Sequence, residues 1–526
     1  MSESLYGMRT VWDLVARRAE LSADRPMLFD DDDRRVTFGE FKQWAERVAA
    51  GFTELGIGEG SAVSWQLPTR IETLVLSVAL SRIGARQNPI IPIYREREVG
   101  FVLRQSQAAW FLVPGVWRGF DYTALAEAVT ATMDEPPRLL VTYDRLPEGD
   151  PSSLPPEPMA AGPGEEAPIR WLYYTSGTTS DPKGVRHSDQ TLLAGAVGVV
   201  ATLRPTEDDV FHMAMPYAHI AGPDLLGALL LHGYSAVVSE IFAPPQAVEV
   251  CRRRGVTIAG GSTAFYTAFV NEQRRRPGER LIPSLRLLMG GGAPKPPEVF
   301  YEVKRELGVP VIHGYGMTEV PMIAFCSIHD TDEQLANTDG KPVRGAEIRV
   351  LGADGTVAPA GMEGELCVRG PMLFKGYTDP SLDIPAFDDD GYFRTGDLGV
   401  VRTDGHVVVT GRNKDIIIRK GENVSAKEVE DLLYRHPKIA DVAVIGLPDR
   451  DRGERVCAVI ETAAGESPIS LQELQDYCRS AGLMMQKIPE QLEIVDALPR
   501  NATLKILKYQ LRQQFVSRDP QESRPA

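Results

Sequence analysis

The sequence is poor in cysteine and has no closely paired cysteines. Five cysteines are scattered over its 526 residues, and no two of them form a Cys-x-x-Cys pair. This spacing argues against a disulfide framework and against a thiolate zinc site. The N-terminus lacks a basic segment followed by an apolar stretch, so no secretory signal peptide is expected. A reducing, cytoplasmic compartment is the simplest prediction.

Long apolar runs and an excess of positive charge are also lacking. The longest apolar stretch, 192–203, is shorter than the roughly 20 residues that a membrane span needs. The net charge is −15, which disfavours general nucleic-acid binding because that function needs a basic surface. A local pocket can be basic in an acidic protein, so a nucleotide or acyl ligand is not excluded.

Internal repeats are absent as well, and helical and strand patterns alternate from the N-terminus to about residue 330. The patterns predict a helix over 37–55, a strand over 62–66 and a second helix over 72–83. The stretch 146–168 is dense in Pro, Gly and Glu, and it predicts a mobile surface connection. Such alternation is typical of a mostly parallel sheet covered by helices.

The remaining sequence predicts two smaller units. Between about residues 340 and 410, short β runs are separated by Asp-Gly dipeptides, and Asp404-Gly405 marks a hairpin. Further on, Ser425 and Glu428 form a capping box at the start of an amphipathic helix, and Ser470 begins another.

Together these patterns predict an α/β fold class. Residues 1–411 are expected to form a large N-terminal domain, which consists of two α/β subdomains and a small β-barrel-like unit. Residues 412–526 are expected to form a small, mobile α/β C-terminal domain, whose size is typical of compact domains.

The sharpest local signal is the string YTSGTTSDPKG, 174–184. A polyphosphate needs many donors at close range: glycines let backbone N–H groups approach its oxygens, hydroxyls add donors, and a lysine supplies positive charge. The string is not the P-loop motif, and a flexible surface turn is the alternative. The predicted nucleotide contacts are Thr175, Ser176, Gly177, Thr178, Thr179 and Lys183.

This string resembles the nucleotide loop of the adenylate-forming superfamily, which includes acyl-CoA synthetases, peptide-synthetase adenylation domains and firefly luciferases. The resemblance runs from about residue 10 to residue 513. Within the superfamily, the chain resembles AMP-forming acyl-CoA synthetases of the type that acts on fatty, alicyclic or steroid carboxylates. The resemblance implies ATP, Mg²⁺ and coenzyme A as cofactors and substrates, with Thr175 and Glu319 as metal ligands.

The string HGYGMTE, 313–319, resembles the family's adenine and magnesium motif. The resemblance implies that Tyr315 stacks on adenine, that Thr318 contacts the α-phosphate and that Glu319 holds Mg²⁺, a hard cation that prefers carboxylate oxygens. A glycine-rich turn with a solvated glutamate is the alternative. Together with the string MGGGAP, 289–294, the motif adds these implied nucleotide contacts: Gly291, Gly292, Ala293, Pro294, His313, Gly314, Gly316 and Met317.

Two later strings resemble the family's ribose and hinge motifs. In YFRTGDLG, 392–399, Asp397 would accept hydrogen bonds from both ribose hydroxyls, because a carboxylate has two acceptor oxygens. In the string that begins at Gly411, Arg412 would contact ribose or phosphate, and Lys414 matches the hinge position. Gly421 matches a glycine beside the pantetheine channel. An Asp in a hairpin turn and a solvated charge run are the alternatives.

Two further strings supply the implied catalytic residues. LPRNATLKILK, 498–508, resembles the C-terminal catalytic lysine motif, with Leu504 where glycine is usual and with Lys505 as the lysine that neutralises transition-state charge. In MPYAHIAG, 215–222, His219 matches an aromatic position that would gate the acyl pocket; a packed structural histidine is the alternative. The predicted catalytic residues are Lys183, His219, Thr318, Glu319 and Lys505.

The acyl-pocket string also bears on the acid. It contains no acidic residue, since Asp224 comes only after it, and an unpaired substrate ammonium would be costly to bury, so amino acids are disfavoured. Small residues, at Gly260, Gly261, Ser262 and 290–292, are expected to leave room for a bulky or long acyl group. The chain also resembles ligases for cyclohexane carboxylates and steroid side chains, and this resemblance implies fatty, alicyclic or steroid side-chain carboxylates as the acids, with lipid metabolism or steroid catabolism as the setting.

The predicted reaction is formation of an acyl-adenylate followed by acyl transfer to coenzyme A. A luciferase-like oxygenase and a ligase that loads a carrier protein share the motifs and remain alternatives, as does a non-catalytic nucleotide-binding protein. The expected partners are small molecules, namely a carboxylate, ATP and coenzyme A. No nucleic-acid partner and no transmembrane segment are expected, and a homodimer is left open.

Overall fold

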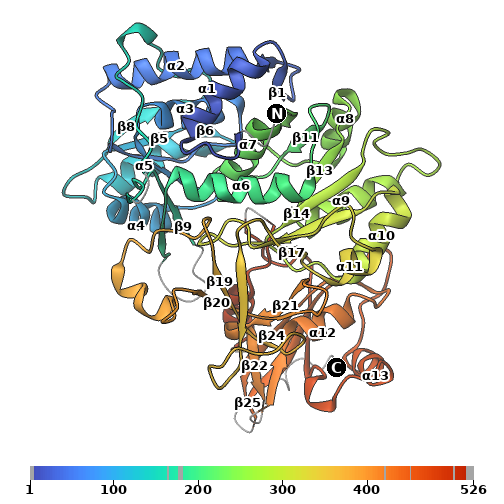
Figure 1. The fold of residues 1–526 in the computed structure, drawn as a ribbon. Coiled ribbons are helices and arrows are strands. Elements are labelled where there is room, and N and C mark those ends of the chain that lie inside the picture. Colours follow the sequence, from blue (N-terminus) through green and yellow to red (C-terminus); the bar gives the residue numbers. More distant parts are fainter. Residues whose placement is uncertain are drawn as a thin grey trace.

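The computed structural model describes residues 5–162, 165–175, 182–419, 422–449, 452–501 and 504–516. Figure 1 shows a large N-terminal part, coloured from blue through yellow to light orange, and a small C-terminal domain below it in darker orange and red. The expected α/β class, with a large N-terminal domain and a small C-terminal domain, is confirmed.

Within the described residues, nine strands form one sheet in the order β17-β16-β15-β14-β13-β11-β12-β1-β2. The central strands from β15 to β1 are parallel, and the edge strands β2, β16 and β17 pair antiparallel. Parallel strands end at the same sheet edge, so the motifs that follow β13, β14 and β15 lie side by side. The strands are β1 Pro26–Asp30, β2 Arg35–Thr37, β11 Val210–Met213, β12 Ser235–Val238, β13 Ile258–Gly261, β14 Leu287–Gly291, β15 Val311–Tyr315, β16 Ala324–Phe325 and β17 Lys341–Pro342.

Among the described residues, six strands form a second sheet, in the order β10-β9-β4-β3-β5-β8. All its pairings are parallel except that of β9 with β10, the strands on either side of the predicted phosphate loop. The strands are β3 Ala62–Trp65, β4 Arg86–Pro89, β5 Trp110–Val113, β8 Arg138–Val141, β9 Trp171–Tyr174 and β10 Gly184–His187, and a short hairpin nearby contains β6 Val116–Trp117 and β7 Phe120–Asp121.

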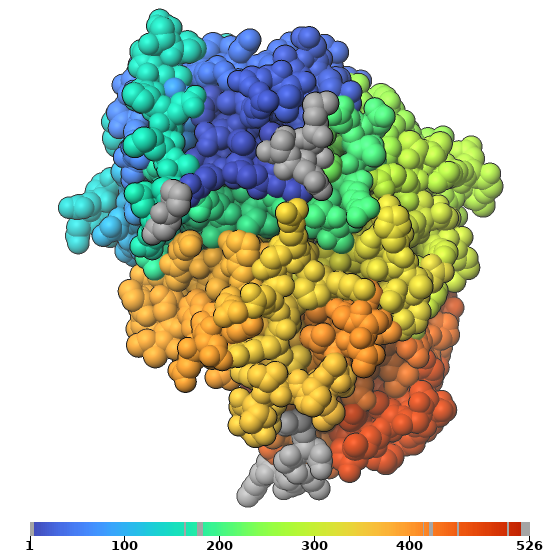
Figure 2. Space-filling model, viewed as in Figure 1, coloured from blue at the N-terminus to red at the C-terminus, as the bar shows by residue number. Residues whose placement is uncertain are grey.

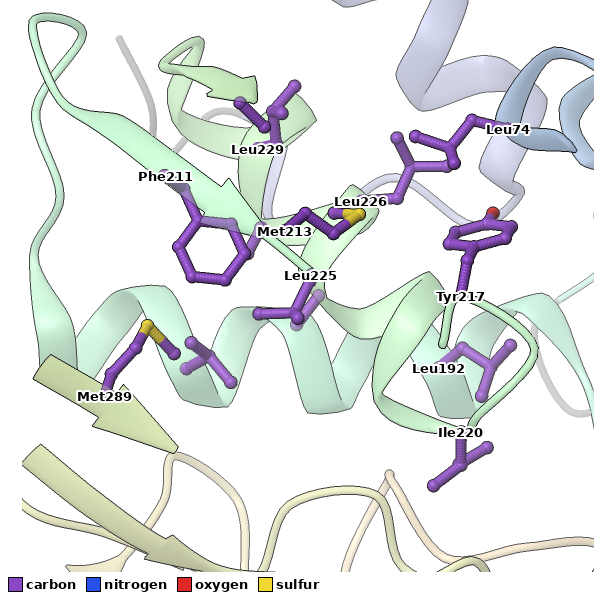
Figure 3. Close-up of a cluster of buried hydrophobic side chains, with 14 of the residues drawn as sticks. Leu74, Leu192, Phe211, Met213, Tyr217, Ile220, Leu225, Leu226, Leu229 and Met289 are labelled. Atoms are coloured by element: carbon purple, nitrogen blue, oxygen red, sulfur yellow. The ribbon is translucent and has the colours of Figure 1, made fainter. Parts of the chain in front are cut away.

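A common core joins the two sheets. Helix α3, Ile71–Arg82, is buried on all sides along its whole length, as expected of a helix between layers. Helices α6, Asp189–Leu203, and α7, Ala221–His232, pack against each other in the same core. Figure 3 shows Leu225 of α7 beside Met213 of β11 within this cluster.

The other helices pack against the strands of the two sheets or against neighbouring helices. Helix α2 begins where the sequence predicts, because Thr37 and Glu40 form a capping box. The remaining helices of the N-terminal domain are α1 Val11–Ser22, α2 Phe38–Glu54, α4 Glu96–Ser106, α5 Tyr122–Thr130, α8 Pro244–Arg254, α9 Thr263–Arg274, α10 Pro297–Leu307 and α11 Asp332–Asn337, with short 3₁₀ turns η2 Pro151–Ser153, η3 Pro380–Leu382 and η4 Ile384–Ala386.

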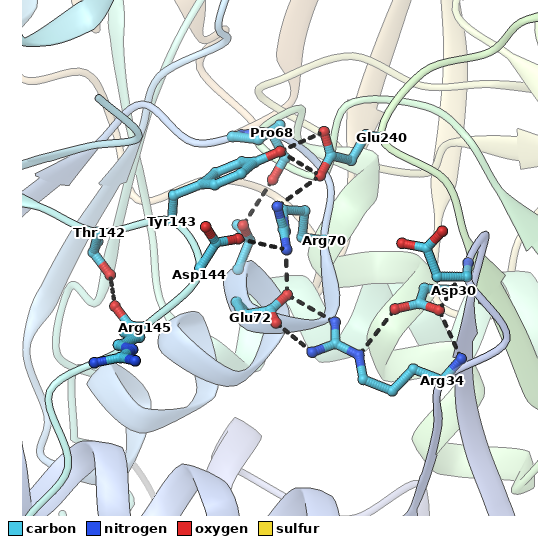
Figure 4. A network of polar contacts seen from close by, with 12 residues as sticks. Asp30, Arg34, Pro68, Arg70, Glu72, Thr142, Tyr143, Asp144, Arg145 and Glu240 are labelled. Carbon is cyan, nitrogen blue, oxygen red and sulfur yellow. Dashed lines mark hydrogen bonds and ion pairs between the residues drawn. The ribbon is translucent and has the colours of Figure 1, made fainter. Parts of the chain in front are cut away.

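A polar network joins the two α/β subdomains where their strands end (Figure 4). Arg70, which follows β3, lies 3.3 Å from Glu72 and 3.0 Å from Glu240, which follows β12. Tyr143 donates to Glu240 at 2.9 Å, and its ring lies under the Arg70 guanidinium. Because the network contains residues that follow strands of both sheets, it links the two subdomains in addition to their common core.

The predicted β-rich unit is present as an antiparallel sheet, in the order β18-β19-β20-β21. The predicted hairpin joins β20 to β21 through Asp404-Gly405, and Gly405 has a φ of 85°, a conformation that glycine adopts without strain. The strands are β18 Glu347–Leu351, β19 Gly364–Arg369, β20 Phe393–Val401 and β21 Val407–Arg412.

The C-terminal domain has its own sheet and cores. Within the described part of the chain, its sheet follows the order β23-β22-β25-β24, with β26 beside β25. Alternate residues of β24 and β25 face two separate apolar clusters, as the period of two in a strand requires. Its elements are η5 Asn413–Asp415, β22 Ile416–Arg419, β23 Glu422–Ser425, α12 Ala426–Leu433, β24 Ile439–Asp449, β25 Gly453–Thr462, α13 Leu471–Ser480, η6 Met485–Lys487, β26 Gln491–Val495 and α14 Lys508–Phe515.

The described residues of the connection, 146–162 and 165–168, lie mostly on the surface as expected, but they are bonded to the helices beneath them. Gly149 donates to the Arg47 carbonyl at 2.9 Å, and Trp12 donates to Glu157 at 2.8 Å. In the ranges that the structure describes, no helix is both long and apolar enough to cross a membrane.

Asp224, in α7, is a buried acid without a described partner. Its side chain is 2% exposed, and neither carboxyl oxygen has a hydrogen-bond partner among the described residues. The carboxyl packs so closely on Gly195 that an added Cβ there would lie 2.8 Å from Oδ2. Burial raises the pKa of Asp224 well above its ordinary value.

We expect Asp224→Asn to stabilise the protein increasingly as the pH rises above about 4. The unfolded carboxyl ionises near that pH, whereas the folded carboxyl keeps its proton, so the wild-type chain loses stability as the pH rises through this window. The advantage of Asn should grow by about 1.4 kcal/mol per pH unit until the folded carboxyl ionises. Urea unfolding at several pH values measures the difference in the free energy of unfolding between the variant and the wild type. Asp208→Asn, at a side chain that is 96% exposed, is the control. A difference for Asp224→Asn that does not change with pH would contradict the expectation.

Candidate active site

A cleft of about 1080 Å³ lies between the N-terminal and C-terminal domains. Figure 2 shows the C-terminal domain in red against the lower part of the molecule, with the β-rich unit in yellow and orange beside it. The volume is close to the upper end of the roughly 300–1,000 Å³ that is usual for small-molecule sites. Predicted site residues from both domains line the cleft: Gly292, Ala293, Pro294, His313, Gly314, Tyr315, Gly316, Asp397, Arg412 and Lys505.

Asp397 of β20 is held by two partners in the cleft. The Tyr315 hydroxyl donates to Oδ2 at 2.7 Å, and Arg412 Nε lies 2.7 Å from Oδ1. Asp397 is 2% exposed. Each carboxylate oxygen therefore already has a protein donor, which fixes the carboxylate plane and leaves its remaining lone pairs for a ligand.

Glu319 and Lys183 meet at a residue that the sequence did not single out, Tyr377. The Tyr377 hydroxyl donates to Glu319 Oε1 at 2.8 Å, and Lys183 Nζ lies 5.0 Å from the centre of the Tyr377 ring. Burial raises the pKa of Glu319, and the bond from Tyr377 opposes this shift. Two predicted residues that are 136 positions apart in the sequence thus share one neighbour.

Thr318 is held through its backbone by a second residue that the sequence did not single out. His187 Nε2 lies 2.8 Å from the Thr318 carbonyl and Nδ1 lies 2.9 Å from the Thr191 hydroxyl. A carbonyl only accepts, so Nε2 carries the proton. Burial lowers the pKa of His187 to about 4, which keeps the ring neutral at neutral pH. His187 follows Lys183 by four residues, but nothing in the local sequence indicates its distant partner.

The glycine-rich string 289–294 begins in the last residues of β14, and those residues pair with β15. An added Cβ at Gly291 would lie 2.6 Å from the Gly314 carbonyl, so glycine permits the close approach, and Gly292 has a φ of 75°. His313 Nε2 lies 3.0 Å from the Ala293 carbonyl. These contacts place the backbone after β14 at the edge of the cleft.

Lys505 is half-buried in the cleft. The charge of Arg412, together with burial, lowers the pKa of Lys505 to about 8, against the opposing effect of Asp397. Burial, followed by the charge of Lys505, lowers the pKa of His219 to about 4. His219 and Thr318 line a neighbouring cavity of about 20 Å³, enough for roughly one water molecule. The C-terminal lysine therefore lies close enough to His219 for its charge to act on the imidazole.

The residue before the lysine has a left-handed backbone. Leu504 has a φ of 63°, which costs a residue other than glycine roughly 1–2 kcal/mol. The turn is held by the Asn501 carbonyl, which accepts from Leu504 N–H at 2.9 Å, and by Asn501 Oδ1, which accepts from Lys505 N–H at 2.9 Å. The leucine therefore keeps the conformation that suits a glycine.

We expect Leu504→Gly to raise the free energy of unfolding by about 1 kcal/mol, because the left-handed backbone is then unstrained. Guanidinium unfolding checks the value. Leu507→Gly is the matched control: Leu507 has a φ of −95°, so its replacement should destabilise the protein. A destabilised Leu504→Gly variant would show that the leucine side chain outweighs the strain.

Several predicted residues lie outside what the structure describes. Residues 176–181 of the phosphate loop, which include Ser176, Gly177, Thr178 and Thr179, and also Gly421, are outside the described ranges. For Lys414 only the backbone, within η5, is described. At the edges of the loop, Thr175 N–H donates to the Lys183 carbonyl at 3.1 Å. Met317 lies in the turn before Glu319, where its N–H donates to the Val320 carbonyl at 3.0 Å.

The residues fit a magnesium ion that arrives with a nucleotide. No group of three or more His, Cys, Asp or Glu side chains within the described ranges could hold a metal ion by itself. Mg²⁺ commonly uses one or two carboxylates together with substrate phosphates. Glu319, near the lysine of the phosphate loop, matches that donor set.

The expectation that small residues leave room for a bulky acyl group is wrong at Gly291, as described above, and at three further glycines, whereas an added Cβ at Gly292 would meet nothing within 4 Å. An added Cβ at Gly260 would lie 2.2 Å from the Met289 carbonyl, and one at Gly290 would lie 2.4 Å from the Gly261 carbonyl. At Gly261 the Phe265 ring fills the space at 3.2 Å. These glycines allow strands β13 and β14 and their side chains to pack closely.

Known families and structures match the chain over most of its length. The AMP-binding enzyme family matches residues 15–378, and the AMP-binding enzyme C-terminal domain matches residues 428–505. The medium-chain fatty-acid–CoA ligase of Escherichia coli is 31% identical over 99% of this chain and 93% of its own length. The salicyl-AMP ligase / salicyl-S-ArCP synthetase of Mycobacterium tuberculosis is 34% identical over 95% of this chain and 90% of its own length.

A solved structure agrees with these matches. ATP-bound MatB from Rhodopseudomonas palustris has a TM-score of 0.84 at 28% identity, covering 96% of this chain and 99% of that chain. The chain therefore belongs to the AMP-binding enzyme family, within the adenylate-forming superfamily. Its relatives include acyl-CoA ligases, so the resemblance stated from the sequence is confirmed.

Proposed function

We propose that the chain is an AMP-forming acid–thiol ligase that converts a carboxylic acid and MgATP to an acyl-adenylate and then transfers the acyl group to coenzyme A. The observation that carries the proposal is the position of Lys505, a lysine of the C-terminal domain that lies in the cleft with Asp397 and Arg412. Family membership supports ATP as the activating substrate, and the coenzyme A ligase among the relatives supports the acceptor.

The nucleotide would lie along the edge of the cleft formed after β14 and β15. Tyr315 and the backbone of 291–294 would contact adenine, and Asp397 would bind the ribose through the lone pairs that Tyr315 and Arg412 leave. Lys183 and the loop 175–179 would contact the phosphates. Mg²⁺ bound with ATP would be held by Glu319 and Thr175 and would supply positive charge at the phosphates.

In the first step a carboxylate oxygen attacks the α-phosphorus in line. The new O–P bond forms as the bond to the bridging oxygen breaks, and pyrophosphate leaves. Positioning and charge neutralisation do most of the work in such transfers. Lys505 would neutralise the attacking carboxylate and the α-phosphate, Thr318 would contact the same phosphate, and His219 would border the acyl group.

In the second step the thiolate of coenzyme A attacks the acyl carbon, and AMP leaves. Residues 412–526 would rotate about Lys414, withdrawing Lys505 and presenting Gly421 to the pantetheine arm. Domain closures that assemble successive sites are an established device. The proposed acids are fatty, alicyclic or steroid side-chain carboxylates.

A second candidate is a ligase that loads a carrier protein. The relative that favours it is the salicyl-AMP ligase / salicyl-S-ArCP synthetase, at 34% identity. A luciferase-like oxygenase is a third candidate that shares the motifs, and dependence of product formation on oxygen would distinguish it.

Carboxylate-dependent exchange of pyrophosphate into ATP tests the proposal. A panel of fatty, alicyclic, steroid, aryl and amino acids is assayed, and products with and without coenzyme A are identified by mass spectrometry. We expect exchange with at least one non-amino acid and an acyl-CoA product. Exchange without an acyl-CoA favours carrier loading, and no exchange with any acid contradicts adenylate formation.

A further inference from the structure

The segment 374–378 connects two parts of the candidate site that belong to different sheets. It runs alongside β10: Lys375 N–H donates to the Arg186 carbonyl at 2.7 Å, and Thr378 N–H donates to the Gly184 carbonyl at 2.7 Å. At its other end, Phe374 N–H donates to the Glu319 carbonyl at 2.9 Å. One short segment is therefore bonded both to the strand that leaves the phosphate loop and to the Glu319 backbone.

Tyr377 repeats this connection with its side chain. Its hydroxyl donates to Glu319 Oε1 at 2.8 Å, and its ring centre lies 5.0 Å from Lys183 Nζ. The side chain is 2% exposed, its ring packs edge-on against Phe374, and its N–H donates to Asp383 at 2.8 Å. Neighbours on every side thus fix the place of the hydroxyl.

We propose that Tyr377 is a positioning residue that orients the Glu319 carboxylate toward the metal ion of MgATP, an inference that rests on the proposed function. A carboxylate that binds a metal ion is commonly fixed by a hydrogen bond to one of its oxygens, and loss of such a bond lowers metal affinity roughly 10- to 100-fold. The Tyr377 hydroxyl supplies that bond on Oε1. Its ring, in contrast, faces the ammonium of Lys183, a contact that does not depend on the hydroxyl.

Tyr377→Phe separates the two contacts, because it removes the hydroxyl and keeps the ring. We expect the affinity for MgATP to fall roughly tenfold and the affinity for ATP in excess EDTA to remain unchanged. Isothermal titration of the full chain with each ligand, without acid or coenzyme A, measures both. Equal losses for both ligands, or no loss for MgATP, would overturn the inference.

Two further variants test the same point. Tyr392→Phe is the matched control, since Tyr392 also donates to a glutamate, Glu347, at 3.0 Å, but on the exposed side of the β-rich unit; its MgATP affinity should equal that of the wild type. In a Glu319→Gln background, Tyr377→Phe should cause no further loss, because the oriented carboxylate is already gone. Additive losses in that cycle would assign Tyr377 a separate, structural role.

These measurements also separate this inference from the proposed function. A wild-type chain that binds no MgATP would contradict adenylate formation itself. A wild-type chain that binds MgATP as tightly as Tyr377→Phe does would contradict only the role of Tyr377. Thermal unfolding midpoints of the variants within a few degrees of the wild type show that the fold is retained.

Discussion

Replacing Lys505 by alanine is expected to slow acyl-adenylate formation by about a hundred- to a thousandfold, the usual effect of removing one group that stabilises transition-state charge. Lys505 lies in the cleft close enough to Arg412 for the two charges to interact, so its loss would leave the crowded negative charge of carboxylate and α-phosphate less neutralised. Thioester formation from supplied acyl-adenylate should stay within a few-fold of the wild type. Pyrophosphate exchange and single-turnover thioester formation measure the two steps.

The matched control for Lys505 is another lysine of the same domain. Lys487 pairs with Glu428 at 2.6 Å on the outside of the domain, so Lys487→Ala should leave both steps near the wild-type rate. If Lys505→Ala slowed both steps equally, the assignment of this lysine to adenylation alone would be wrong.

Lys414→Pro is expected to have the opposite effect, with pyrophosphate exchange retained and thioester formation reduced about a hundredfold, the scale of loss from misplaced reactants. Lys414 lies in the 3₁₀ turn η5, between the strand that ends at Arg412 and β22. Proline fixes φ near the value of such a turn, so the present arrangement of the domains is kept and rotation is hindered.

Lys414→Ala is the control for the hinge, because it removes the side chain and leaves the backbone free to rotate. Both half-reactions should then remain within a few-fold of the wild type. Equal losses of exchange and thioester formation in Lys414→Pro would place the hinge elsewhere, since a local distortion of the cleft would affect both steps.

The elements that were predicted correctly depend on neighbours in the sequence. The start of α2 follows from Thr37 and Glu40, which are three residues apart, and the β20–β21 hairpin follows from Asp404-Gly405. Caps and tight turns are closed by hydrogen bonds over a few residues, so their signals are local. The expectation of space for an acyl group at Gly260 was wrong because the carbonyl of Met289, in a neighbouring strand, occupies that space.

The candidate site likewise contains residues that the local sequence indicates and contacts that only the tertiary structure shows. The sequence pointed to Tyr315, Asp397 and Arg412 in separate motifs, whereas the structure shows that Tyr315 and Arg412 both bind Asp397. Tyr377 and His187 could not be recognised from the sequence, because nothing in their local sequence indicates that they bind Glu319 and Thr318.

The sequence by itself determined the α/β class, the large N-terminal domain followed by a small C-terminal one, and the capped helices, because periodicity, caps and loop composition act over short distances. Only the tertiary structure decided which motifs share the cleft and which ordinary residues hold them there. Sheet order and domain packing bring together side chains that are tens to hundreds of positions apart, as with Tyr377 and Lys183, and no local pattern records such contacts.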